Sequence, residues 1–290
     1  MSYQVTSTKV KSMVRSLIAQ FLILPLFFVG LASCSEPTFP VEIRFQAMVG
    51  EQAFSCQSTY ENQGSANTEI SFTDFRFYLH NIRLVTDEGE EIPLTLDDDN
   101  TWQQEHLALL DFEDGTGTCR NGSEQMHTTL VGQAPDRTFN ELRFTIGVPF
   151  EDNHINPATA DPPLTFTNMS WGWQGGYKFL RADVSSSEYN FIFHLGSTGC
   201  EGTIGDISGC SRLNRAEVTL TNFNPATDTI IVDAALLFES TNVSQNTQDS
   251  LSGCMSTQND PDCADLFANM GLNLETGHAE STASFFRVQE

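Results

Sequence analysis

The residues best suited to chemistry lie in long segments between predicted strands. Residues 168–179 contain Met169, Trp171 and Trp173 together with three glycines. In an extended chain these three side chains point to one face. A core aromatic cluster is the ordinary explanation for such residues, but three neighbouring glycines weaken a strand that only has to pack. The composition therefore indicates a binding segment.

Histidines are the second group that could do chemistry. His80 and His194 stand in alternating, strand-like runs, and His154 stands in a loop rich in Asn and Pro. Any one of them alone is usually a surface or structural residue. Imidazole and thioether groups together are the borderline and soft ligands that favour copper(I) over calcium or magnesium. Zinc also binds histidine, so these residue types alone leave the metal open.

Sequence motifs of enzymes are absent. The chain has no GxSxG, no HExxH, no P-loop and no convincing dinucleotide fingerprint. We therefore predict a binding protein and not an enzyme. Two other classes stay open. One is an adhesion or carbohydrate-binding β domain whose Trp102, Trp171 and Trp173 stack on sugars. The other is a secreted enzyme using scattered Asp and Glu, for which the sequence nominates no residues.

The elements that must position these residues are mostly strands. Apolar residues alternate with polar ones, a period of two that is typical of half-buried strands. A short helix is predicted over Asp262–Met270. The fold class is therefore all-β, a β-sandwich or barrel with long loops and disulfide stabilisation. The alternating runs cover residues 75–80, 142–148, 190–195, 216–220 and 230–238.

The first 33 residues have the layout of a bacterial lipoprotein signal peptide. An apolar run over Leu17–Leu31 leads into Leu31-Ala32-Ser33-Cys34, which matches a lipobox. We expect cleavage before Cys34 and a lipid on its sulfur; ordinary secretion with cleavage near Ala32 is the alternative. Residues 34–40 then form a tether, and residues 41–290 form one domain whose part 241–290 is a cysteine-containing C-terminal extension. The predicted location is the periplasm or cell surface, and Ser35 after Cys34 favours anchoring to the outer membrane by the lipid on Cys34.

Charge and cysteines agree with export. Removing residues 1–33 removes three basic residues and no acidic one, so the net charge moves from −24 to −27. Such a surface repels nucleic acid. With Cys34 set apart, six cysteines remain, which read as three disulfides among 15 possible pairings. Close spacing favours Cys200–Cys210 and Cys254–Cys263, leaving Cys56–Cys119. A thiolate metal site is the alternative, although no CxxC occurs.

Five segments match, in order, the motifs of one known family. The stretch from His194 to Cys200, His-Leu-Gly-Ser-Thr-Gly-Cys, is long and unusual. Over roughly residues 41–240 the chain resembles the MbnP-like family of copper-binding proteins, also called metallo-mystery-pair four-Cys proteins. The segments are Asp74–Leu79 with Asn81–Leu84, Leu109–Gly115 with Cys119, Gly147–Phe150 with Asn153 and His154, Met169–Trp173 with Gly176–Phe179, and Phe193–Cys200 with Cys210.

The resemblance implies a cofactor and a partner. Family members work beside a di-haem c-type cytochrome or peroxidase-like enzyme of the MbnH/MauG type, thought to oxidise a tryptophan to kynurenine, which then binds copper(I) with histidines. Carried onto this chain, the oxidised residue is Trp171 or Trp173. The ligands are His154 and His194, with His80 or Met169 as further candidates. The four family cysteines resemble Cys56, Cys119, Cys200 and Cys210, whereas Cys254 and Cys263 fall in a tail that the family pattern does not place.

Overall fold

The structure, a computed structural model, describes Met1 and residues 36–289. The predicted signal peptide and the predicted lipidation site Cys34 therefore lie outside the described residues. Contacts divide the chain into Met1–Glu36 and Pro37–Glu290, and the fold below is that of the second unit. Within the described part of the chain, no helix has the length and apolar character needed to cross a membrane.

The first large sheet is built around β1, whose residues alternate between solvent and the core. Ile43, Phe45, Ala47 and Val49 of this strand are buried. The strand order is β19-β18-β1-β9-β6, with β2 added to β1. β1 pairs with β18 in parallel and with β9 in the antiparallel sense. The strands are β1 (Thr38–Val49), β2 (Gln52–Ala53), β6 (Thr95–Leu96), β9 (Thr129–Pro135), β18 (Thr229–Asp233) and β19 (Phe286–Gln289).

The second large sheet is built around β4, a 19-residue strand. Its main order is β14-β13-β4-β10-β17; the short strands β3, β5 and β8 also pair with β4, and β7 pairs with β8. All pairs to β4 are antiparallel. The strands are β3 (Tyr60–Gln63), β4 (Thr68–Thr86), β5 (Glu91–Pro93), β7 (Gln103–Gln104), β8 (Leu107–Asp111), β10 (Phe139–Ile146), β13 (Leu180–Ser185), β14 (Asn190–Leu195) and β17 (Ala216–Thr221).

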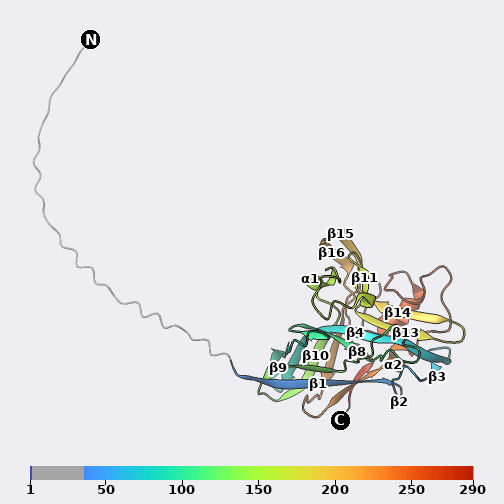
Figure 1. The fold of residues 1–290 in the computed structure, drawn as a ribbon, viewed down its shortest axis with the longest axis horizontal. Helices are drawn as coiled ribbons and strands as arrows, with labels where there is room; N and C mark the ends of the chain where they lie inside the picture. Colours follow the sequence, from blue (N-terminus) through green and yellow to red (C-terminus); the bar gives the residue numbers. More distant parts are fainter. Residues whose placement is uncertain (2–35, 290) are drawn as a thin grey trace, which may run out of the picture. The chain divides into compact units, whose positions relative to one another are not determined.

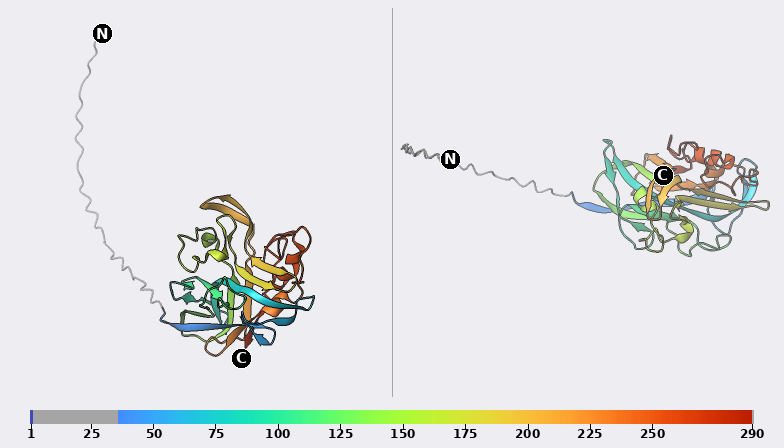
Figure 2. Two further views of the ribbon diagram at one scale, coloured as in Figure 1. Left: turned by 45° about the vertical axis from the view of Figure 1, so that its right-hand side comes forward. Right: turned by 90° about the horizontal axis from the view of Figure 1, so that it is seen from above.

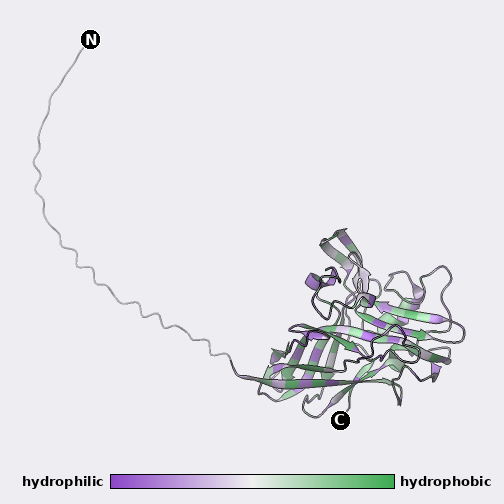
Figure 3. Cartoon of the chain, in the orientation of Figure 1, coloured by the Kyte–Doolittle hydropathy of each residue, from purple (hydrophilic) through white to green (hydrophobic). Residues whose placement is uncertain are grey.

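The two large sheets pack face to face, so the predicted all-β class is confirmed as a sandwich (Figure 1). Aromatic rings join the layers. Phe45 of β1 and Phe286 of β19 both contact Phe144 of β10, with ring centroids 6.0 Å and 5.4 Å apart. Figure 3 shows hydrophobic and hydrophilic residues alternating along the strands, the pattern from which the strands were predicted. Burial of the apolar faces between the sheets is the main stabilising force of such a fold.

Helices and two small sheets lie outside the sandwich core layers. The short predicted helix is confirmed as η2 and α3. The hairpin of β15 and β16 projects from the domain beside α1 and β11 (Figures 1 and 2). These elements are α1 (Phe150–Asn153), η1 (Thr167–Met169), β11 (Ser170–Gly172), β12 (Gly176–Tyr177), β15 (Thr198–Thr203), β16 (Asp206–Arg212), α2 (Ala234–Phe238), η2 (Pro261–Cys263) and α3 (Ala264–Asn269).

One predicted strand is wrong at its end. The alternating run 230–238 is a strand only to Asp233, after which α2 begins. The Asp233 carboxylate accepts a hydrogen bond from the backbone N–H of Ala235 at 3.1 Å. This N-cap stops the strand and starts the helix, because it satisfies an amide that the first helical turn leaves without a partner.

Three disulfides join the six cysteines in the pairing that close spacing favoured. They are Cys56–Cys119, Cys200–Cys210 and Cys254–Cys263. The first ties the loop after β2 to the loop after β8, and the second joins facing residues of the β15–β16 hairpin. The third anchors the C-terminal segment, whose Cys254 pairs with Phe193 of β14. The disulfides thus hold three separate loop regions that border the second sheet.

Candidate metal site

The paired tryptophans line an open pocket at the end of β11. Trp171 and Trp173 are half-buried and share a cavity of about 630 Å³ with Met255. The remaining lining residues are glycines, Ser197, Thr198, Gln174 and the disulfide-bonded Cys200, so no carboxylate lines it. The cavity therefore offers aromatic, thioether and neutral polar groups, which suit a soft ion better than calcium or magnesium.

Glycines make room for the Trp171 indole. A Cβ on Gly196 would lie 2.4 Å from Cζ3 of Trp171, and a Cβ on Gly175 would lie 2.9 Å from its Cβ. Gly172 has a φ of +103°, a conformation that L side chains rarely adopt. The glycines beside the tryptophans therefore serve close packing of the ring on the backbone and the turn between β11 and β12.

The His194 imidazole lies beside the Trp171 indole. Its ring centroid is 6.3 Å from that of the indole. Its backbone is fixed by β14 and by a 2.9 Å hydrogen bond from its N–H to the carbonyl of Cys254. Only 7% of the residue is exposed, and burial lowers the pKa of its imidazole. The side chain is therefore neutral near pH 7, the form that binds metals.

The Asp183 carboxylate orients this imidazole. Nε2 of His194 lies 3.3 Å from Oδ2 of Asp183, and an ionised carboxylate can only accept, so Nε2 carries the proton. Burial alone raises the Asp183 pKa, but the hydrogen bond from His194 and the Arg181 guanidinium outweigh burial and lower it. Nδ1 of His194 is then a buried lone pair, and it has no hydrogen-bond partner. Such an orphan acceptor needs an explanation in a well-packed core.

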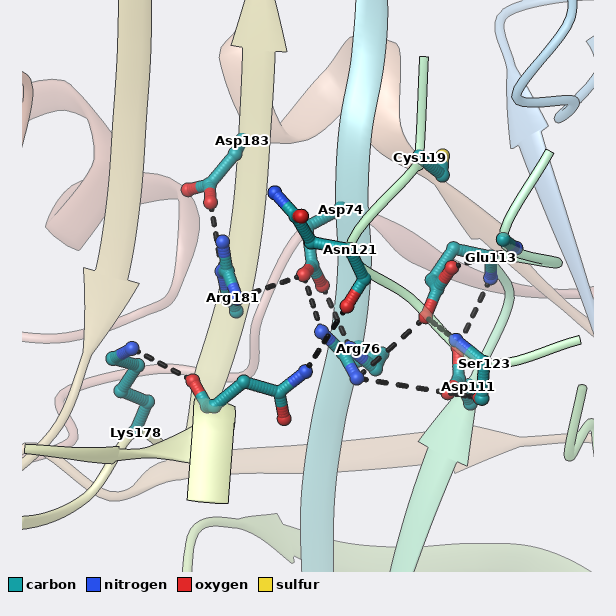
Figure 4. Close-up of polar contacts among 12 residues, drawn as sticks. Asp74, Arg76, Asp111, Glu113, Cys119, Asn121, Ser123, Lys178, Arg181 and Asp183 are labelled. Carbon is teal, nitrogen blue, oxygen red and sulfur yellow. Dashed lines mark hydrogen bonds and ion pairs between the residues drawn. The ribbon is translucent and has the colours of Figure 1, made fainter. Parts of the chain in front are cut away.

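A network of buried charged side chains holds the Asp183 carboxylate in place (Figure 4). Arg181 bonds Asp183 at 2.7 Å and Asp74 at 3.0 Å. Both carboxylate oxygens of Asp74 accept hydrogen bonds from the Arg76 guanidinium, which makes a bidentate ion pair. Arg76 is fully buried and also faces Glu113 at 3.6 Å. The network runs across the sheet from β8 through β4 to β13, and it ends at the carboxylate that orients His194.

The far end of this network holds a fourth carboxyl group, Asp111. It lies 3.9 Å from Arg76 and is fully buried. Burial raises its pKa to about 8, because removal from water outweighs the attraction of Arg76. Asp111 is therefore mainly protonated at neutral pH, which reduces the excess of negative charge around Arg76.

His154 lies on the other side of the tryptophan segment. It follows α1, and its Nδ1 lies 3.0 Å from the carbonyl oxygen of Trp173. Its Nε2 lies 3.2 Å from the side-chain amide of Asn153 and 3.5 Å from Sγ of Cys210. Burial lowers its pKa. The structure thus associates His154 with Trp173 and the hairpin disulfide, whereas it associates His194 with Trp171.

His80 stands apart from the tryptophan pocket. It lies on β4 opposite Leu107 and Thr145. Burial, with the nearby charges of Arg215 and His106, lowers its pKa to about 4. Its Nε2 is buried without a hydrogen-bond partner. His80 is not among the residues that line the cavity.

Two expectations about side-chain direction are wrong. Met169 does not share a face with the tryptophans, because it ends the 3-10 turn η1 and is fully buried in the core. Trp102 cannot stack on a ligand, because it is 8% exposed and is stacked on Phe166 with ring centroids 4.8 Å apart. The methionine that does line the pocket is Met255. Sequence periodicity could not reveal it, since it reaches the pocket through the pairing of Cys254 with Phe193.

Comparison with known proteins places these features in a family. A sequence model of the MbnP family matches residues 38–256. Among solved structures, MbnP from Methylosinus trichosporium is similar with a TM-score of 0.78 and 30% sequence identity, over 87% of this chain and 98% of that chain. No curated protein matches the sequence. The family-model match covers the second sheet, the first sheet except β19, the tryptophan segment and the hairpin disulfide, and the chain therefore belongs to the MbnP family.

Proposed function

We propose that this chain is an extracytoplasmic copper(I)-binding protein whose site forms at Trp171 and His194 after Trp171 is oxidised to kynurenine. The observation that carries the proposal is the free Nδ1 of His194, buried without a partner beside the Trp171 indole. Asp183 holds the other nitrogen. Metal-bound histidines commonly donate their second N–H to a carboxylate in this manner.

The residues present fit copper(I) in their chemistry. Kynurenine replaces the single indole N–H donor with an aromatic amine and a ketone. Met255 supplies a thioether on the wall of the same pocket. Neutral imidazole and thioether ligands favour copper(I), and no carboxylate lines the cavity to attract a harder ion. His154, on the Trp173 side, is a candidate for a further ligand; His80 and Met169 lie outside the lining of this pocket.

Between the two tryptophans, the structure favours Trp171 as the modified residue. Its ring centroid lies 6.3 Å from that of His194, whose Nδ1 has no hydrogen-bond partner, whereas Trp173 contacts His154 through its backbone carbonyl. Both indoles are half-buried and line the cavity, so an oxidising partner can reach them. We assign that role to a di-haem enzyme, as the resemblance implies, and we assign the anchoring of the protein to a lipid on Cys34.

The test is mass mapping followed by copper titration. Protein is produced with and without a di-haem partner, and peptides containing residues 168–179 are analysed by mass spectrometry. We expect oxidation at Trp171 only with the partner, abolished by Trp171→Phe and retained by the matched variant Trp173→Phe. Copper(I) binding by chelator competition is expected to fall in His194→Ala and to persist in His106→Ala, an exposed histidine. Unmodified tryptophans together with no copper retained after dialysis would refute the proposal.

A second candidate function rests on the same pocket. Two half-buried indoles at an open cavity are also suited to stacking on a sugar, because an aromatic face packs against apolar surface. A glycan array would reveal it as saturable binding that is lost in Trp171→Ala or Trp173→Ala and retained in His194→Ala. Copper binding is instead expected to fall in His194→Ala. The response of this variant therefore separates the two functions.

A further inference from the structure

We propose that the Cys200–Cys210 disulfide masks a second metal site. When the bond is reduced, the two cysteine thiolates and Nε2 of His154 bind one thiophilic ion, copper(I) or zinc(II). Its only residue in common with the site built on Trp171 and His194 is His154, the candidate further ligand there. Its existence does not depend on tryptophan oxidation.

The ligand atoms are already gathered. One nitrogen of His154 and the sulfurs of Cys200 and Cys210 all lie within 4.8 Å of one another. Within the described residues this is the one group of three His, Cys, Asp or Glu side chains with that spacing. The sulfurs come from facing positions of the β15–β16 hairpin, and the imidazole comes from the loop after α1. Reduction frees two ligands without requiring either element to move far.

His154 is held in the tautomer that a metal ligand needs. The carbonyl oxygen of Trp173 can only accept, so Nδ1 at 3.0 Å carries the proton and Nε2 carries the lone pair. That lone pair lies 3.5 Å from Sγ of Cys210. At present it accepts from the Asn153 amide at 3.2 Å, a hydrogen bond that a metal would replace. A backbone carbonyl behind the second ring nitrogen is a recurrent support of metal-bound histidine.

Exposure singles out this disulfide for reduction. Cys200 and Cys210 are half-buried on a projecting hairpin (Figure 2). Cys56, Cys119, Cys254 and Cys263 are at most 2% exposed. Thiol–disulfide exchange requires access of the attacking thiolate to a sulfur. A dithiol reductant therefore reaches the hairpin bond before the two buried ones.

The chemistry balances with a dithiol as the reductant. The dithiol gives two electrons and two protons and becomes a disulfide, while the Cys200–Cys210 sulfur–sulfur bond breaks and two thiols form. Metal binding then displaces both thiol protons to solvent and uses the two thiolates with the neutral imidazole. Two sulfurs and one nitrogen are the ligands that copper(I) and zinc(II) share.

The test uses the mature protein produced without a partner enzyme and carrying His194→Ala, which removes the first site. After mild reduction, alkylation and peptide mapping establish which cysteines are free. Copper(I) affinity is measured by chelator competition, and cobalt(II) serves as a probe of thiolate coordination by its charge-transfer absorption. We expect labelling at Cys200 and Cys210 alone, one ion bound per reduced chain, and a cobalt–thiolate band that is absent from the oxidised protein.

Variants separate a metal site from loose thiol binding. Loss of a supporting partner alone weakens metal sites about 10–100-fold, so His154→Ala is expected to weaken copper(I) binding by more than about 100-fold. The matched variant His106→Ala, at an exposed histidine, is expected to change nothing. Cys200→Ser with Cys210→Ser is expected to bind no ion at this site. If that variant does not fold, parent protein that is first reduced and then alkylated at Cys200 and Cys210 is expected to show the same loss of binding. Equal affinities of reduced His154→Ala and reduced parent, or first reduction of a buried disulfide, overturn the proposal.

Discussion

The Asp183 carboxylate determines which nitrogen of His194 is free. Asp183→Asn removes the negative charge that accepts from Nε2, so the imidazole is no longer held with Nδ1 unprotonated. We expect copper(I) affinity of the modified protein to fall about 10–100-fold, the usual effect of losing such a partner. Chelator competition measures the affinity, and nitrogen NMR of His194 reports its tautomer.

The matched control for that variant is Asp152→Asn. Asp152 also contacts a histidine, His106, at 2.9 Å, but this pair is on the surface. Its replacement is expected to leave copper binding unchanged. Unchanged affinity in Asp183→Asn, with the tautomer of His194 preserved, would show that Asp183 has only a structural role.

His80 gives the protein a sensitivity to acid. In the unfolded chain its pKa is near 6.5, and in the fold burial lowers it to about 4. Acid therefore favours the unfolded chain: the stabilising contribution is present above pH 6.5 and is lost as the pH falls toward 4. Because one pKa unit corresponds to about 1.4 kcal/mol, the loss is at most about 3.5 kcal/mol.

The variant His80→Leu is expected to flatten the dependence of unfolding free energy on pH between 6.5 and 4. Urea titrations at pH 7, 5.5 and 4 measure it, with exposed His278→Leu as the control. A variant whose stability falls with pH as steeply as that of the parent protein would show that other groups cause the acid sensitivity.

At the scale of single residues, the sequence predicted the tryptophans and His194 of the candidate site. It did not predict the residues that complete the site and orient His194. Trp171, Trp173 and His194 are recognisable from residue type and motif. Asp183 reads as one polar residue in an alternating strand, and Met255 lies in a segment without a motif. Both reach His194 through the pairing of separate strands and segments, which no local pattern encodes.

At the scale of elements, β4 depends on the buried charge of Arg76. Arg76→Met leaves Glu113 buried without its cation and leaves Asp74 paired with Arg181 alone. Breaking a buried ion pair on one side costs about 3–5 kcal/mol, and we expect a loss of that size in urea unfolding. Arg143→Met removes a half-exposed arginine paired with Glu91 and Glu141, and it is expected to cost less than about 1 kcal/mol. Similar losses in the two variants would contradict a structural role for the network.

The prediction of strands from alternation succeeded where one face of the strand is buried. It failed where the chain leaves the extended conformation at a helix cap or a turn. Alternation identified the strands that contain Phe144, Phe193 and Val218. It missed the end of β18 because the Asp233 cap, and not hydrophobicity, starts α2. It also treated Met169 as part of a strand, although the chain turns there before β11 begins.

At the scale of the whole molecule, the C-terminal segment completes the sandwich. β19 closes one edge of the first sheet, and the Phe286 ring lies 5.8 Å from that of Phe77. Motifs could not place this segment, since edge pairing depends on distant residues. We expect a chain ending at Ser256 to lose near-ultraviolet circular dichroism and cooperative unfolding. Phe286→Ala in the full chain is expected to cost about 3–5 kcal/mol. A truncated protein that unfolds at the same urea concentration as the intact one would contradict this.

The parallel pairing of β1 with β18 has a consequence for how the chain reaches its final form. Arg44 at one end of the protein aligns with Thr229 near the other. The first strand therefore has no partner on that side until most of the chain has been synthesised. Folds governed by such distant pairings assemble slowly. The first large sheet of such a nascent chain therefore stays incomplete, and it closes only once β18 and β19 have been synthesised.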